Sequence, residues 1–142
     1  MNESYEQLKL GNQLCFPLYA AARKIVNLYT PHFKMSGLTY TQYIVFMALW
    51  ETDGQTVGDL CKKLYLDSGT LTPLLKKMEH AGWVTRKRSE QDERVVEIHL
   101  TDEGWNMREQ LKDIPAQVGM CVSLKPEEAQ LLYKLLYEIL EV

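Results

Sequence analysis

Apolar side chains recur every three or four residues along six stretches of the chain, and this period predicts α-helices. Their approximate bounds are residues 12–30, 39–52, 56–66, 67–82, 101–118 and 126–142. Between the fourth and fifth stretches the period changes. Val96, Ile98 and Leu100 occupy every second position there, which predicts a β-hairpin over residues 83–100 with one buried face. The pattern therefore predicts a mainly α protein with a small β element.

Capping residues and prolines set the expected ends of the first helix. Asn12 is a candidate N-cap, and Pro31 is expected to close the helix. Pro17 lacks the N–H that a helix interior needs, so the helix either begins near Phe16 or bends just after Cys15.

The fourth helix has end signals of its own. Asp67 or Ser68 can cap its start, and Gly82 is expected to end it. Pro73 is expected in its first turn, where a missing N–H costs little. In the fifth helix, Pro115 is expected to bend or break the chain.

The length and composition fit a single domain spanning residues 1–142. Apolar residues make up 46% of the chain and charged residues 25%, which is ordinary for a soluble globular protein. No apolar run approaches the roughly 20 residues that a membrane-spanning helix needs. The polar N-terminal residues also lack the basic and apolar segments of a signal peptide. A cytoplasmic protein with no membrane partner is therefore expected.

Cysteine and histidine residues are too scattered to predict a disulfide framework or a metal site. Cys15, Cys61 and Cys121 are far apart, and their odd number argues against a secreted disulfide scaffold. No C-x-x-C or H-x-x-x-H spacing occurs. We therefore expect neither a bound metal nor a cofactor.

The charge is distributed unevenly along the chain. The net charge is −3, but residues 62–94 carry eight Lys or Arg and five Asp or Glu, so this segment is +3 and the remainder is −6. Phosphates respond to local rather than net charge. The segment is either a polyanion-binding surface or a solvated charged face, and charge alone favours the second.

Helices followed by a basic hairpin, over about residues 39–100, form the layout of a winged helix-turn-helix DNA-binding unit. In such a unit the second helix of the pair enters the major groove with its N-terminal residues at base edges. Short hydroxyl side chains lie at the start of that helix, and two lysines follow one to two turns on. The candidate contacts from this helix are Ser68, Thr70, Thr72, Lys76 and Lys77.

The hairpin supplies a second group of candidate DNA contacts. Arg86 and Arg88 lie on its first strand. Arg94 lies at its tip, where a guanidinium can enter the minor groove, and Asp92 can orient it through a bidentate pair. Each feature alone also fits a helix cap or a solubilising strand, but their order along the chain favours DNA binding.

Two stretches of the chain strongly resemble the MarR family of winged-helix repressors: LYLDSGTLTPLLKKME at 64–79 and TRKRSEQDERVVEIHLTDEG at 85–104. NQLCFPLY and LTYTQYIVFMALWE resemble its organic-hydroperoxide-sensing branch, the OhrR regulators. The resemblance runs from about Leu10 to Gly104 almost without gaps, and the C-terminal third matches in pattern only.

This resemblance implies a small β wing and a helical dimerisation region built from both chain ends, about residues 12–30 and 103–142. The implied partners are a second copy of the chain and double-stranded DNA, with one palindromic operator per homodimer. The broad apolar face of the last helix independently fits a dimer. The implied function is that of a transcriptional repressor and not of an enzyme.

The position of Cys15 alone fits two interpretations. A cysteine on an apolar seam is most often a small, inert core residue, whereas a helix N-terminus and phenol hydroxyls stabilise a reactive thiolate. The resemblance implies the second interpretation, with Tyr29 and Tyr40 of the other copy against the thiolate and Tyr19 nearby. An organic hydroperoxide, the implied inducer, would then oxidise Cys15 to a sulfenic acid, and the repressor would release its operator.

The remaining cysteines differ in what the resemblance implies for them. Cys121 lies close to the place of a resolving cysteine in two-cysteine members, so it is either the partner of Cys15 in an intersubunit disulfide or a bystander. Cys61 has no counterpart in the motif and is expected to be structural. Pro17 departs from the family pattern, in which a helix former follows the Cys-Phe pair, and this affects the expected environment of the thiol.

Three other functions are open on the sequence alone. A MarR-type repressor induced by a small aromatic ligand, without redox chemistry, would use the same DNA contacts, and Cys15→Ser would leave its induction intact. A thiol peroxidase would need a strand-supported cysteine with an activating arginine nearby, and the sequence shows no such motif. An architectural DNA binder would prefer no operator over random DNA.

Overall fold

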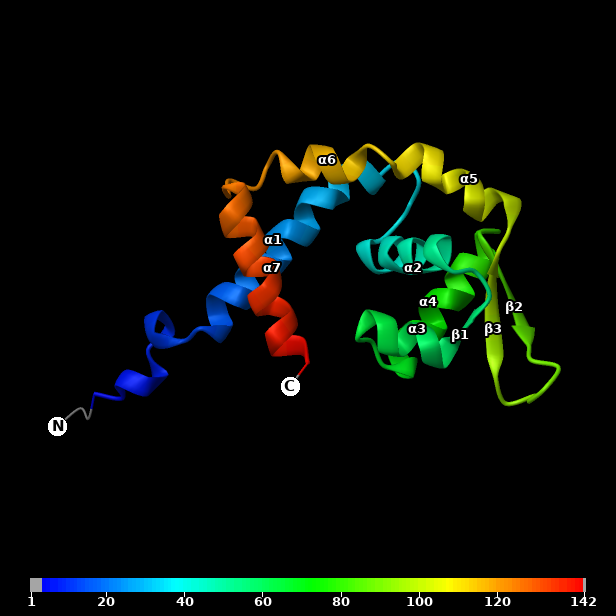
Figure 1. Ribbon diagram of the computed structural model, residues 1–142, viewed down its shortest axis with the longest axis horizontal. Coiled ribbons are helices and arrows are strands. Elements are labelled where there is room, and N and C mark those ends of the chain that lie inside the picture. Colours follow the sequence, from blue (N-terminus) through cyan, green and yellow to red (C-terminus); the bar gives the residue numbers. More distant parts are fainter. Residues whose placement is uncertain (1–3, 142) are drawn as a thin grey trace.

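A computed structural model gives the fold for residues 4–141; residues 1–3 and 142 of the predicted single domain lie outside the described residues. The chain forms a winged unit and a set of helices that arches over it and extends away from it (Figure 1). The winged unit contains α2 (Tyr40–Glu51), β1 (Gln55–Thr56), α3 (Val57–Leu64), α4 (Ser68–His80), β2 (Val84–Arg88) and β3 (Val96–Leu100). The helical arch contains α1 (Cys15–Phe33), α5 (Asp102–Leu111), α6 (Ile114–Gly119) and α7 (Pro126–Leu140). Two short 3-10 turns, Glu6–Leu8 and Leu10–Asn12, precede α1. The mainly α fold with a small β wing is confirmed.

The sheet of the winged unit has the order β1-β3-β2, and both strand pairs are antiparallel. The predicted hairpin is confirmed, with Val84 opposite Leu100 and Arg88 opposite Val96. The alternation along β3 buries Ile98 and Leu100 on one face. The sequence analysis missed β1, because a two-residue strand has no period to detect.

Side-chain caps fix where the helices of the winged unit begin. Thr39 and Gln42 form a reciprocal capping box at the start of α2. The side chain of Thr56 caps α3, and Asp67 Oδ1 accepts the backbone N–H of Thr70 at 2.7 Å to cap α4. Gly82, with φ +82°, ends α4 in the left-handed conformation, as predicted.

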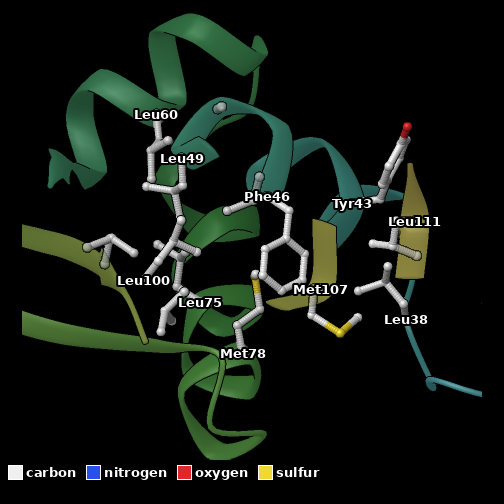
Figure 2. Close-up of a cluster of buried hydrophobic side chains, with 14 of the residues drawn as sticks. Leu38, Tyr43, Phe46, Leu49, Leu60, Leu75, Met78, Leu100, Met107 and Leu111 are labelled. Atoms are coloured by element: carbon white, nitrogen blue, oxygen red, sulfur yellow. The ribbon is translucent and has the colours of Figure 1, made fainter. Parts of the chain in front are cut away.

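The core lies between α2, α4 and the hairpin and continues under α5 and α6. Figure 2 shows the ring of Phe46 at its centre, with Met78 and Met107 against it. The side chains of Phe46, Leu49, Leu60, Leu71, Leu75, Met78 and Ile98 are all fully buried. This packing holds α4 at a fixed position relative to the hairpin.

The structure corrects both ends predicted for the first helix. Asn12 is not its N-cap: the helix α1 begins at Cys15, and the Asn12 side chain instead donates to the Glu6 carbonyl. The helix also does not close at Pro31 but continues to Phe33. Proline here removes one hydrogen bond in the last turn, and the burial of Phe33 in the core holds that turn in place.

Two other proline predictions have mixed outcomes. Pro73 lies in the second turn of α4 and not in the first, because the helix begins at Ser68. The buried faces of the surrounding turns keep the helix intact in spite of the missing N–H. Pro115 does mark a break, since α5 ends at Leu111 and Pro115 lies in the first turn of α6.

Two helices of the arch leave broad apolar surfaces uncovered. Only Phe33 of α1 is buried, and α7 buries no residue at all. The large exposed apolar side chains of these helices are Phe16, Leu18, Tyr19, Ile25, Val26, Leu131, Leu132, Tyr133, Leu135, Tyr137, Ile139 and Leu140. No helix within residues 4–141 is long and apolar enough to cross a membrane.

The start of α5 is joined tightly to the short segment between α4 and β2. Thr101 caps α5 and its hydroxyl donates to the Gly82 carbonyl at 2.6 Å. Gly104 is buried against Trp83, and the indole N–H of Trp50 donates to the Gly104 carbonyl at 3.0 Å. This junction connects the winged unit to the arch.

Gly104→Ala is expected to destabilise the protein, because an added Cβ would lie 2.2 Å from the Trp83 carbonyl oxygen. Overpacking of this kind costs about 1–3 kcal/mol, to be measured as the free energy of unfolding in urea. Gly58→Ala is the matched control, because its Cβ would meet only the Thr56 hydroxyl at 3.8 Å. An equal effect of the two substitutions would contradict the close-packing explanation.

Candidate nucleic-acid interface and thiol site

The helix α4 buries one face and exposes the other. Leu71, Leu75 and Met78 pack into the core with no exposed surface. Four of the five DNA contacts predicted on this helix are exposed: Ser68, Thr70, Lys76 and Lys77. The structure therefore places hydroxyls at the N-terminal end of the outward face and cations one to two turns along it.

Arg86 is held against α4 and does not project freely. Its backbone N–H donates to Glu79 Oε2 at 2.9 Å, and its Nε donates to Glu79 Oε1 at 3.4 Å. This ion pair joins β2 to the last turn of α4. Glu79 was not among the predicted site residues, since nothing in the local pattern shows that the hairpin returns to this helix.

A cavity of about 430 Å³ lies between the start of α3, the helix α4 and the hairpin. Thr72, Arg86 and Arg94 line it together with apolar side chains. These three predicted residues are therefore brought together, with Thr72 turned toward the hairpin and not along the outward face.

The tip of the hairpin, which we call the wing tip, consists of residues 89–95. Asp92 Oδ1 accepts the backbone N–H of Arg94 at 3.0 Å, and Arg94 Nε lies 3.6 Å from the same oxygen. The predicted contact between the two side chains exists, but one carboxylate oxygen makes it and the pair is not bidentate. The Arg94 side chain is 93% exposed, so its guanidinium is free to meet a partner.

Arg88, at the end of β2, turns back across the wing tip. Its Nη1 donates to the Glu93 carbonyl at 2.8 Å. The side chain is exposed, but it is engaged with the hairpin's own backbone.

Cys15 is the first residue of α1, and its side chain is exposed. Pro17 lies in the first turn, where its missing N–H breaks no hydrogen bond of the helix. A surface hollow of about 480 Å³ begins at the next residue of α1 and is lined by Phe16, Tyr19 and Arg23 among others, without Cys15 itself. The Arg23 guanidinium lies 5.6 Å from the centre of the Tyr19 ring. The structure thus places the thiol at a helix N-terminus beside an aromatic surface with a cation.

Tyr29 and Tyr40 lie together but far from the Cys15 of their own chain. Their ring centres are 5.0 Å apart, and both rings pack against Tyr43. The rings of Tyr29 and Tyr43 also pack against Phe33, which completes one aromatic cluster. Tyr29 follows Cys15 by 14 residues on one continuous helix, a rise of about 21 Å. Of the three tyrosines predicted for the thiol site, only Tyr19 lies within one helical turn of Cys15 in the same chain.

Burial keeps the phenols of this cluster protonated. It raises the pKa of Tyr29 and Tyr40, and Tyr29 adds to the effect on Tyr40. Burial, with Tyr29 and Tyr40 as neighbours, raises the pKa of Tyr43 to about 12. The sequence analysis missed Tyr43, although its spacing of three from Tyr40 along a helix places both on one face.

The other two cysteines are also free thiols. Cys121 is exposed after α6, with its Sγ 3.6 Å from the Gln117 carbonyl. Cys61 is half-buried and packs against the core, as expected for a structural residue. Within the part of the chain that the structure describes, no group of three His, Cys, Asp or Glu side chains is arranged to hold a metal ion.

Comparison with known proteins agrees with this geometry. The family described as "Transcriptional regulator SarA/Rot" matches residues 27–111. The organic hydroperoxide resistance transcriptional regulator of Bacillus subtilis is 44% identical over 141 residues, which cover 99% of this chain and 96% of that protein. The chain therefore belongs to the MarR and SarA/Rot family of winged-helix transcriptional regulators. Within that family, it is similar to the regulators of organic hydroperoxide resistance.

AbfR of Staphylococcus epidermidis is a second relative, solved in several states. Its reduced form bound to DNA superposes with a TM-score of 0.80 at 37% identity, covering 96% of this chain and 95% of that one. Its overoxidised form bound to DNA gives a TM-score of 0.76 at 38% identity, with 96% of each chain covered. Its disulfide form gives 0.65 at 37% identity, with 95% of each chain covered.

The free energy of unfolding is expected to fall as the pH rises from about 10 to about 12. The folded state raises the pKa of Tyr43 to about 12, so it favours the protonated phenol. This contribution to the free energy of unfolding is complete below the ordinary tyrosine pKa near 10, and it is lost as the pH rises from there to about 12. Tyr43→Phe removes the ionisable hydroxyl. The free energy of unfolding of this variant, measured by urea titration between about pH 10 and 12, should therefore depend less steeply on pH. An equally steep dependence in Tyr43→Phe and the original chain would contradict this assignment.

Proposed function

We propose that this protein is a repressor that binds double-stranded DNA as a homodimer and releases it when an organic hydroperoxide oxidises Cys15. The observation that carries the proposal is the separation of the exposed Cys15 thiol from the Tyr29–Tyr40 pair along one helix with an uncovered apolar face. A thiol sensor needs these groups together, and a second copy of the chain provides them.

The DNA-binding part of the proposal rests on α4 and the wing tip. Exposed Ser68 and Thr70 at the start of α4 suit base edges or phosphates in the major groove, and Lys76 and Lys77 suit the backbone. Arg94 at the exposed wing tip suits the adjacent minor groove. The DNA-bound forms of AbfR support the same use of this fold.

The dimer is supported by the exposed faces of α1 and α7. Apolar side chains recur along these helices without any cover from their own chain, and such surfaces in monomeric proteins mark interaction sites. If two copies pack α1 against α1 in opposite directions, the Cys15 end of one lies beside the Tyr29 end of the other. The two thiol sites are then completed symmetrically, as a two-fold interface requires.

The chemistry begins with the Cys15 thiolate, which accepts hydrogen bonds from the protonated phenols of Tyr29 and Tyr40 of the second copy. The sulfur attacks one peroxide oxygen, the O–O bond breaks, and an S–O bond forms. The leaving alkoxide takes a proton and departs as the alcohol, so Cys15 becomes a sulfenic acid and the hydroperoxide is reduced. The apolar surface beside Cys15 suits an organic hydroperoxide better than hydrogen peroxide.

Cys121 then resolves the sulfenic acid. Its thiolate attacks the Cys15 sulfur of the second copy, an S–S bond forms as the S–O bond breaks, and the leaving hydroxide takes a proton from solvent and departs as water. The exposure of both thiols permits this attack. AbfR exists in a disulfide form and also binds DNA when overoxidised, which favours the disulfide over oxygen addition as the event that separates the two α4 helices.

Arg94→Ala is expected to weaken operator binding by about 5- to 160-fold at fixed salt, because loss of a groove contact costs about 1–3 kcal/mol. The measurement is fluorescence anisotropy with a duplex that the protein itself selects from a random-sequence library. Lys112→Ala, which removes an exposed cation directly after α5 and outside the winged unit, is the matched control for charge. Unchanged affinity of Arg94→Ala would remove the wing tip from the interface.

Cys15→Ser is expected to bind the selected duplex normally but to stay bound after one equivalent of cumene hydroperoxide per chain. In the original protein the same treatment should release the duplex and give a covalent dimer of two 16.5 kDa chains on non-reducing mass analysis. Cys121→Ser should gain one oxygen on Cys15, form no covalent dimer and keep its duplex.

Two outcomes would redirect this proposal. Release from Cys121→Ser with one added oxygen would keep Cys15 as the sensor but make Cys121 a bystander. Retention of the duplex by the original protein, with three free thiols still counted, would reject redox sensing and favour a repressor induced by a small aromatic ligand.

A further inference from the structure

One peptide unit of the wing tip is held by charged side chains at both of its edges. The carbonyl of Glu93 and the N–H of Arg94 belong to the same planar peptide. Arg88 Nη1 donates to that carbonyl at 2.8 Å, and Asp92 Oδ1 accepts from that N–H at 3.0 Å. The plane therefore cannot rotate without breaking a charge-assisted hydrogen bond on one side or the other.

The position of Arg88 at the end of its strand makes this contact possible. Arg88 and Val96 form the last register pair of the hairpin, and the seven residues 89–95 loop beyond them. Ser89 N–H donates to the Val95 carbonyl at 2.8 Å and closes the base of the loop. From this closed base the Arg88 side chain spans the loop to the Glu93 carbonyl.

The peptide that Arg88 holds sets the direction in which Arg94 leaves the backbone. The orientation of that peptide fixes φ of Arg94 and thereby the direction of its Cα–Cβ bond. Beyond this fixed base the Arg94 side chain is 93% exposed. The wing tip thus combines a rigid root with an exposed guanidinium, which pairs with Asp92 at 3.6 Å, and the loss of motion on reaching a groove is confined to the side chain itself.

The neighbouring cation behaves differently. Lys87 also lies on β2 and is exposed, but among residues 4–141 its Nζ reaches only the Glu90 carboxylate, at 3.8 Å, and holds no backbone group. The two residues carry equal charge one position apart on the same strand. They therefore separate an effect of charge near DNA from an effect of holding the wing tip.

We propose that Arg88 is a positioning residue for DNA recognition: it orients the Glu93–Arg94 peptide so that Arg94 enters the groove, and it does not itself contact DNA. This rests on the proposed function, in which the wing tip meets DNA. It replaces the expectation that Arg88 is one of the direct DNA contacts.

A double-mutant cycle tests the proposal with the selected duplex at fixed salt. Arg88→Ala should weaken binding by about three- to tenfold, in keeping with one hydrogen bond lost. In the Arg94→Ala background the same substitution should have no further effect, because Arg88 acts only through Arg94. Additive losses in the double variant would overturn the proposal.

The salt dependence of binding gives a second, independent readout. Arg88→Ala should leave the slope of log K against log salt unchanged, whereas loss of one phosphate contact lowers it by about 0.9. Arg88→Lys keeps the charge but not the planar donor, so it should bind like Arg88→Ala and not like the original chain. Lys87→Ala is the matched charge control on the same strand. A lowered slope in Arg88→Ala, or full affinity in Arg88→Lys, would make Arg88 a phosphate contact and overturn its positioning role.

The clamp can also be measured without DNA, by the ¹⁵N order parameter of the Arg94 amide in the free protein. It should fall from the rigid range, about 0.85, toward the flexible range, below about 0.6, in Arg88→Ala and not in Lys87→Ala. An unchanged order parameter would show that Arg88 does not hold this peptide. If instead the order parameter falls but the original protein prefers no duplex, the proposed function fails while the clamp itself stands.

Discussion

Gly104 approaches the Trp83 carbonyl so closely that no side chain fits between them, and this contact joins the two halves of the molecule. The indole of Trp50 donates to the Gly104 carbonyl, and Thr101 connects the same turn to Gly82 at the end of α4. The helix that leads into the arch is thus bonded to α2 and to the root of the hairpin. A displacement of α5 has to move the hairpin and α4 with it, which gives the arch a direct mechanical connection to the DNA-facing surface.

One chain contains all the residues of the proposed sensor site but does not bring them together. The exposed thiol of Cys15 and the protonated phenols of Tyr29 and Tyr40 are each well suited to their roles. Along the helix α1, the backbone positions of Cys15 and Tyr29 are separated by a rise of about 21 Å, and Tyr40 packs at the Tyr29 end. The same helix exposes the apolar face that a second copy would cover. Binding of a second copy would therefore both complete the site and cover this surface.

Local signals in the sequence were sufficient for most of the fold. The cap at Asp67 and the alternation along β3 act within a few residues, and the structure confirms both. The predicted helix end at Pro31 was wrong because the burial of Phe33, a tertiary effect, outweighs the loss of one hydrogen bond. The site followed the same rule: residue type placed Arg88 on the hairpin, but its partner became apparent only when the loop geometry was known. The relation between Cys15 and the tyrosines came from family resemblance and not from the pattern.

Within its own chain, the helix α1 packs on the core at its C-terminal end, through Leu28, Tyr29 and Phe33, while its Cys15 end is exposed, and this makes it a lever. Its nineteen residues span roughly 28 Å, so a rotation of about 5° about the anchored end moves the other end by roughly 2.5 Å. In the opposite direction, a bond formed at the Cys15 end acts with a long arm on the aromatic cluster around Phe33. A small force at the thiol therefore produces a large torque where α1 meets the core. Pro31 removes a hydrogen bond near that point, which makes the helix easier to bend there.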